Sequence, residues 1–110
     1  MLIIPTEIEL AAYRFQITIE SVIYIFQFRW NTVHEYWTFD ILNYQSVPLI
    51  SGVKVVINYP LLNRYASSLL PPGEIIALDT SGKLDRVGRN DLGDSVKLIY
   101  VTAAEYDALI

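Results

Sequence analysis

The chain has 110 residues, which is enough for one domain that buries roughly two-thirds of its unfolded surface and too few for a second core. It contains no cysteine, so disulfide scaffolds and thiolate metal sites are excluded and stability must come from packing. Eight basic and twelve acidic residues give a net charge of −4, which argues against nucleic acid because phosphate binding needs clustered Lys and Arg.

The first ten residues predict an extended N-terminal arm. Residues 1–4 are apolar, but Pro5 and Glu7 follow at once and no Lys or Arg precedes them, so the pattern is not that of a signal peptide. No stretch approaches the roughly 18 apolar residues of a membrane-spanning helix. We therefore expect a soluble protein that is synthesised in the cytoplasm and has no membrane partner.

Residues 13–30 carry the strongest local signal, a β-hairpin. Apolar side chains occupy every second position of residues 13–20 and of residues 22–30, and a period of two excludes a helix. The connection between the two segments lacks the Asn-Gly pair of the tightest turns, so the sequence leaves the turn type open. The second segment is apolar on its other face as well, at Ile23 and Ile25, which predicts a place inside a sheet or beneath a neighbouring subunit.

Four more strands are expected along the chain. Residues 36–42 continue the alternation and pair with the second strand, and residues 49–57 follow with a bulge or bend at Ser51-Gly52. Residues 74–78 and 95–101 complete the set. The pattern predicts an all-β fold, either a small antiparallel β-barrel or a two-sheet sandwich of about six strands.

One or two short helical segments and a long polar loop connect these strands. Pro60 favours a helical turn over residues 60–65, and Thr102 with Glu105 has the spacing of a capping box that opens a helix. Residues 79–94 are the most polar stretch and are expected to be an exposed loop. The whole chain, residues 1–110, is expected to form a single β domain.

The residues do not predict a catalytic, cofactor or metal site. His34 lies in a polar loop, and the serines lack the Gly-x-Ser-x-Gly context of an activated nucleophile. The segment from Asp79 spaces oxygen ligands around Gly82 as a calcium loop does, but Lys83 would repel a cation and no glutamate closes the loop. We expect no cofactor, no bound metal and no enzymatic activity.

Composition predicts a surface that other protein covers. Hydrophobic residues make up 53% of the chain and charged residues 18%, against about a quarter in an average soluble domain. Apolar surface left uncovered by such a composition usually marks a partner or further copies of the chain. The aromatic residues between positions 24 and 39 fit core and subunit packing better than a stacking platform, because no basic groove accompanies them. Arg29 is expected to be held by Asp40 or by a carboxylate of a neighbouring chain.

A series of short motifs spans almost the whole chain. They are Phe28-Arg29-Trp30-Asn31, Trp37-Thr38-Phe39-Asp40-Ile41, Leu49-Ile50-Ser51-Gly52-Val53, Leu70-Pro71-Pro72-Gly73-Glu74, Leu78-Asp79-Thr80 and Asp91-Leu92-Gly93-Asp94. Their order and spacing resemble a family of small phage tail proteins, the cyanophage-type baseplate plug proteins. The resemblance implies a non-enzymatic structural subunit of a contractile-tail baseplate, which plugs or bridges the tail tube and the central hub and spike.

The partners that the resemblance implies are proteins of the same virion. They are neighbouring hub, spike and tail-tube proteins, together with other copies of this chain in a homo-oligomeric ring of three or six. Synthesis in the host cytoplasm, a final location in the virion and no sequence-specific nucleic-acid contact complete the expectation. The apolar arm is suited to strand addition on a neighbour. The candidate interface residues are Leu2, Ile3, Ile4, Arg29, Trp30 and Trp37.

A second reading of the residues is a monomeric ligand-binding β-barrel. In that case Tyr24, Trp30 and Trp37 would line a mouth for a sugar or for single-stranded nucleic acid.

Overall fold

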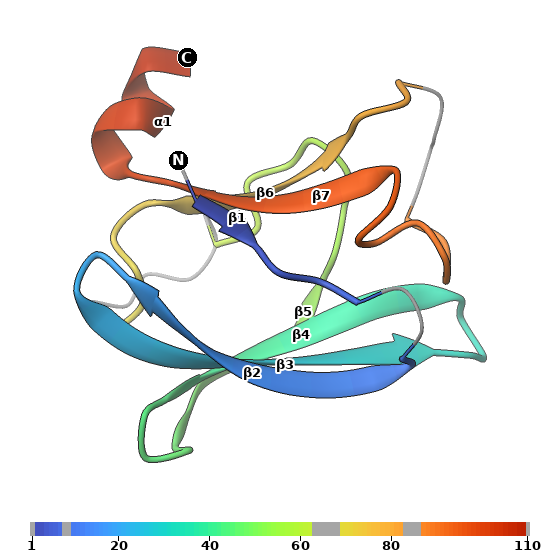
Figure 1. The fold of residues 1–110 in the computed structure, drawn as a ribbon, viewed down its shortest axis with the longest axis horizontal. Coiled ribbons are helices and arrows are strands. Elements are labelled where there is room, and N and C mark those ends of the chain that lie inside the picture. Colours follow the sequence, from blue (N-terminus) through green and yellow to red (C-terminus); the bar gives the residue numbers. More distant parts are fainter. Residues whose placement is uncertain (1, 8–9, 63–68, 83–86, 110) are drawn as a thin grey trace.

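The computed structural model describes residues 2–7, 10–62, 69–82 and 87–109. In this part of the chain, seven strands form two antiparallel sheets that face each other, and one helix follows (Figure 1). The elements are β1 (Leu2–Ile4), β2 (Ala12–Ile19), β3 (Val22–Asn31), β4 (Tyr36–Asn43), β5 (Pro48–Lys54), β6 (Glu74–Asp79), β7 (Val96–Val101) and α1 (Ala103–Leu109). The two sheets are separate, so the sandwich form of the predicted all-β class is confirmed and the barrel form is not.

The lower layer in Figure 1 is a four-stranded meander in the order β2-β3-β4-β5. The predicted hairpin is confirmed, with Phe15 opposite Phe26, and β3 lies inside the sheet as its two apolar faces predict. Glu20 and Ser21 connect β2 to β3 with φ values of 48° and 69°. Positive φ at both positions is what a two-residue type I′ turn requires, and this turn twists with the strands it joins.

The upper layer is a three-stranded sheet in the order β1-β7-β6. The apolar start of the predicted N-terminal arm pairs with β7 of its own chain, Leu2 opposite Tyr100 and Ile4 opposite Leu98. Ile4 is 1% exposed, and burying it in the chain's own core explains why the arm folds back. β1 is therefore an edge strand of the sandwich.

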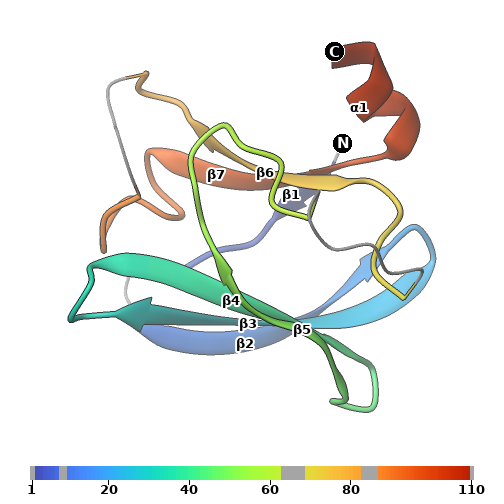
Figure 2. The same ribbon diagram turned by 180° about the vertical axis from the view of Figure 1, so that it is seen from behind.

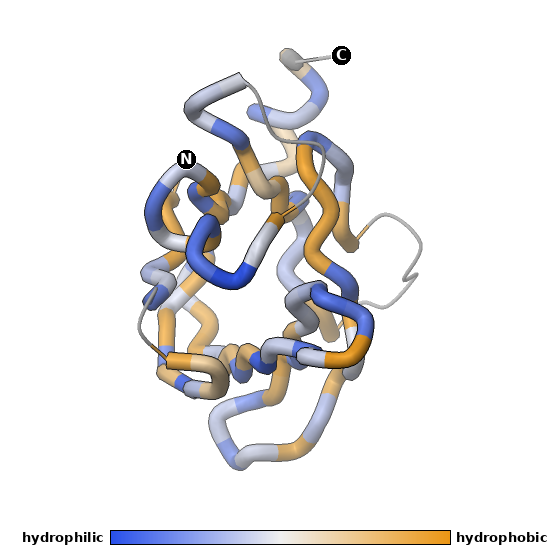
Figure 3. Tube along the Cα trace, turned by 90° about the vertical axis from the view of Figure 1, so that its right-hand side faces the viewer, coloured by the Kyte–Doolittle hydropathy of each residue, from blue (hydrophilic) through white to orange (hydrophobic). Residues whose placement is uncertain are grey.

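The core lies between the inner faces of the two sheets and is rich in aromatic rings. Phe26, Phe28, Trp37 and Phe39 are all 0% exposed. Phe26 and Phe39 stack with nearly parallel planes at a centroid distance of 5.9 Å, which is an offset arrangement that aromatic pairs prefer. Figure 3 shows hydrophobic and hydrophilic residues alternating along the trace, as expected for strands with one buried face.

The segment before β7 differs from the expected exposed loop. Val87 is 2% exposed and Leu92 0% exposed, so both belong to the core. The indole Nε1 of Trp37 donates a hydrogen bond to the carbonyl of Gly88 at 3.2 Å, which fastens this loop over the end of the sandwich. The prediction was wrong for this part because two apolar residues outweigh the charges around them; residues 83–86 lie outside the described residues.

The chain crosses from the lower to the upper layer after β5, which ends at Lys54 instead of continuing to the predicted residue 57. Asn58 N donates to the Ala77 carbonyl at 2.7 Å and Leu61 N to the Ile75 carbonyl at 2.9 Å, so the crossing segment covers the edge of β6 (Figure 2). Residues 60–62 are not helical, and the rest of the helical turn predicted there lies outside the described residues.

Helix α1 starts at the predicted capping box. Glu105 N donates to Thr102 Oγ1 at 3.2 Å, and Thr102 N donates to Glu105 Oε1 at 2.9 Å. The helix extends away from the sandwich on the side of the three-stranded sheet (Figure 1). None of the helical residues described forms a span long and apolar enough to cross a membrane.

Candidate contact surfaces

The outer face of the four-stranded sheet carries the cations of its strands. Arg14, Arg29 and Lys54 are the basic residues of β2–β5, and all three are exposed. Thr38 pairs with Arg29 on one side and with Lys54 on the other, so these three residues form one row across β3, β4 and β5. At the usual strand spacing, the Cα atoms of Arg29 and Lys54 lie about 10 Å apart.

One buried carboxylate organises this face. Asp40 accepts hydrogen bonds from Gln27 Nε2 at 3.0 Å, from Arg29 Nη2 at 3.0 Å and from the Gly52 amide at 2.8 Å. The predicted pairing of Arg29 with Asp40 is therefore confirmed within the chain. Three donors compensate the burial of the carboxylate, whose side chain is only 7% exposed.

The same contact explains the irregularity predicted in β5. The register between β4 and β5 shifts on both sides of Ile41, and Gly52 has a φ of +70°. A glycine adopts this left-handed conformation without steric cost, which lets the strand bend so that its amide reaches Asp40. The bulge and the buried carboxylate thus depend on each other.

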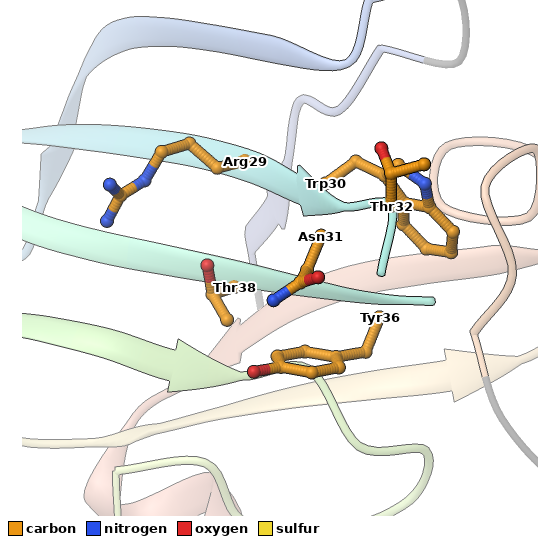
Figure 4. Close-up of a pocket in the computed structure, with 6 residues that line it drawn as sticks. All are labelled: Arg29, Trp30, Asn31, Thr32, Tyr36 and Thr38. Atoms are coloured by element: carbon orange, nitrogen blue, oxygen red, sulfur yellow. The ribbon is translucent and has the colours of Figure 1, made fainter. Parts of the chain in front are cut away.

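A shallow hollow of about 460 Å³ lies beside this cluster (Figure 4). It is lined by Arg29, Trp30, Asn31, Thr32, Tyr36 and Thr38. The Nζ atom of Lys54 lies 5.0 Å from the centre of the Tyr36 ring, a distance at which the ring attracts a cation. Arg29 uses only Nη2 in its contacts with Asp40, and its side chain remains 54% exposed. The hollow is open, has a mixed polar and aromatic lining, and is flanked by two cations.

A second surface is an apolar groove of about 390 Å³ at the opposite end of the four-stranded sheet. It is lined by Val22, Ile23, Tyr24, Asn43, Tyr44, Val47, Pro48, Leu49 and Leu69. Tyr44 and Leu69 are each 66% exposed, and none of the described residues that line the groove is charged. Exposed apolar side chains gathered at one place make this groove a candidate contact site for another protein.

The structure separates the predicted interface residues by exposure. In β1, Ile3 is 64% exposed on the outer face, whereas Leu2 is half-buried and Ile4 is in the core. Trp37 is fully buried, and Trp30 packs against it edge-on at 5.6 Å while remaining half-buried. Arg29 lies at the sheet surface, far along the chain from β1 and in the other layer.

Lys54, Tyr36 and the apolar groove are absent from the sequence-based set. Lys54 and Arg29 share a row only because of the β4–β5 register, which contains two shifts that strand alternation does not reveal. The exposed apolar residues at positions 22 and 23 begin the second predicted strand, and those at positions 44 and 47 lie in the connection between the third and the fourth, so the available signal was their place at strand ends.

The described residues offer contacts more readily than chemistry. In this part of the chain, every buried side-chain nitrogen and oxygen has a hydrogen-bond partner, and no three His, Asp or Glu side chains gather as metal ligands. His34 is exposed and stacks against Tyr36 at 6.2 Å. The fold and these surfaces define a small two-sheet β sandwich with a cationic face and an apolar groove.

Comparison with known proteins identifies the family. The family model described as cyanophage baseplate Pam3 plug gp18 matches residues 1–104, and the chain belongs to this family. Membership assigns it a structural role in the tail baseplate of a phage virion, in association with other baseplate proteins. No curated protein matches the chain.

Proposed function

We propose that this chain is a non-enzymatic subunit that plugs or bridges the tail tube and the central hub and spike of the baseplate. The family match over residues 1–104 is the observation that carries the proposal. The apolar groove supports a role in assembly, because a subunit held by its neighbours needs complementary surface.

The proposed contact with a neighbouring baseplate protein is the apolar groove. On its rim, the Val22 side chain is 50% exposed and the Val47 side chain 51% exposed. Burying these apolar side chains against a partner would lower the free energy of the complex. The hub, spike and tail-tube proteins are the proposed partners. Three or six copies of the chain, assembled in the virion after synthesis in the host cytoplasm, would match the symmetry of a tail.

The monomeric ligand-binding barrel has less support. Tyr24 is 4% exposed and Trp37 0% exposed, so neither ring lines an open mouth as that function requires. We do not propose it.

The groove can be tested by replacing valine with threonine, which has nearly the same shape. A Val22→Thr, Val47→Thr double variant should enter assembled baseplates several-fold less than the unaltered chain, measured by quantitative mass spectrometry of purified particles. Val33→Thr is the matched control, because Val33 is 83% exposed and lies outside the groove. Normal incorporation of the double variant would reject the groove. Absence of the unaltered chain from purified baseplates would reject the function itself.

A further inference from the structure

We propose that helix α1 of one copy docks on the cationic outer face of the four-stranded sheet of a second copy, between Arg29 and Lys54. The proposal rests on the proposed function, in which several copies assemble, and it adds the two surfaces that meet. Most of α1 lies beyond residue 104, where the family match ends, so the contact would belong to a part of the chain that the family pattern does not describe.

The two surfaces carry opposite charge. The strands of the four-stranded sheet hold three of the eight basic residues of the chain and one acidic residue, Asp40, which is already paired. Eleven of the twelve acidic residues and five of the eight basic ones therefore lie elsewhere. A chain whose four-stranded sheet is cationic and whose remaining residues carry more acidic than basic groups favours a head-to-tail orientation of its copies.

Helix α1 has the properties of a docking element. It has seven residues, carries Glu105 and Asp107, and has no basic residue in its last turn. A helix this short is marginal on its own, and its main contact with another described element is with the end of β7. Its carboxyl end has partial negative charge, which no cation of the helix offsets, so a cationic surface would stabilise it.

The geometry favours this pairing between copies. Figures 1 and 2 show α1 on the side of the three-stranded sheet, whereas Arg29 and Lys54 lie on the outer face of the other layer, so one copy cannot bring them together. The spacing of about 10 Å between the Arg29 and Lys54 Cα atoms equals the diameter of a helix, roughly 10–12 Å. Unlike surfaces that meet in this way make a heterologous interface, which closes into a ring when the rotation permits.

Reversal of one charge on each surface tests the contact. Lys54→Glu and Asp107→Lys should each weaken self-association of the full-length chain about tenfold, measured by sedimentation equilibrium at low salt. The double variant Lys54→Glu, Asp107→Lys should recover most of the loss, because the pair is restored with its charges exchanged. Association of the unaltered chain should also weaken in about 1 M salt, where the Debye length is only about 3 Å.

Asp94→Lys is the matched control, since it reverses an exposed acidic residue outside α1 and should leave the effect of Lys54→Glu uncorrected. Thermal unfolding of each variant confirms that the fold is retained, as expected for exposed positions. A monomer at every concentration, association that the single reversals do not change, or no recovery in the double variant would overturn the proposal. A monomeric chain that is still recovered from baseplates would overturn this contact and leave the proposed function standing.

Discussion

Tyr100 joins the two layers of the sandwich through its hydroxyl. It donates a hydrogen bond to Glu20 Oε2 in the β2–β3 turn and accepts one from the Gly73 amide at 2.7 Å. Glu20 adopts a positive φ that is unfavourable for a residue with a side chain, and this bond offsets part of that cost. Burial and the hydrogen bond to Glu20 raise the pKa of Tyr100 above its ordinary value of about 10.

The raised pKa of Tyr100 predicts a loss of stability at alkaline pH. Below about pH 10 the phenol is neutral in both the folded and the unfolded chain, so its contribution is fully present. Above that pH the unfolded chain releases the proton first, and the free energy of unfolding falls as the pH rises toward the folded pKa. Denaturant titrations from neutral pH to about pH 11 should show this decline.

Tyr100→Phe should reduce that alkaline decline and cost about 1–2 kcal/mol at neutral pH, because Glu20 and the Gly73 amide lose their partner. The decline should not vanish, since burial also raises the pKa of Tyr13 and of Tyr24. Tyr59→Phe is the control, as Tyr59 is 56% exposed. An unchanged pH profile in Tyr100→Phe would show that the phenol is not linked to folding.

Gly73 lies too close to β7 for a side chain. A Cβ atom there would be 1.9 Å from the Val101 carbonyl oxygen, which is backbone and cannot turn aside. Gly73→Ala should therefore lower the free energy of unfolding by about 3 kcal/mol or more, measured by urea denaturation. Gly82→Ala should cost only about 1 kcal/mol. The added Cβ would meet no atom within 4 Å, and the loss comes only from the backbone φ of +70°, which is unfavourable for alanine. Equal losses would contradict the close approach.

At the scale of elements, the course of β5 depends on the buried carboxylate of Asp40. Asp40→Ala leaves the Gly52 amide and Gln27 without their acceptor, and should cost about 2–3 kcal/mol in urea denaturation. Arg29→Ala should cost about 1 kcal/mol, because Asp40 keeps two donors and the Arg29 side chain is half in solvent. The opposite order would show that the ion pair, and not the bulge, is the main role of Asp40.

The sequence predicts local pairing better than long-range pairing in this fold. Alternation determined the hairpin and the third strand because a shift of one residue would expose every buried ring. It did not determine that β1 joins β7, since three apolar residues suit an arm or an edge strand equally well. The burial of Val87 and Leu92 was also missed, because it depends on packing between distant segments; the Gly88 carbonyl beside Val87 accepts its hydrogen bond from Trp37, 51 residues earlier in the chain.

The candidate surfaces were likewise predictable from the sequence only where they depend on neighbouring strands. The pairing of Arg29 with Asp40 was predictable from two facing strands, but its extension to Lys54 was not, because the shifts around Ile41 set that register. The family resemblance identified the class of protein from motif order, and it carried no information on which side chains reach the surface. Trp37 is the clearest example, being a predicted interface residue that the core encloses.

At the scale of the whole molecule, we predict that the chain forms a single domain and unfolds in one cooperative transition. Both tryptophans lie in the four-stranded sheet, so their fluorescence reports on that layer. The chain has no cysteine, so Leu78→Cys on β6 adds a unique thiol. Position 78 is 37% exposed, and a dye attached there reports on the three-stranded sheet. The two signals should change at the same urea concentration, because the layers share one core. Separate midpoints would show two folding units.

The strand order of the upper layer has a consequence for biosynthesis. β7 lies between β1 and β6 and is translated after both, so β1 has no partner strand in its sheet until β7 has emerged. The meander can form as it emerges, since each of its hairpins is local in sequence. Until translation reaches residue 101, the phenylalanines on the inner side of the meander lack a complete opposing sheet, and this exposed apolar surface is open to non-native contacts.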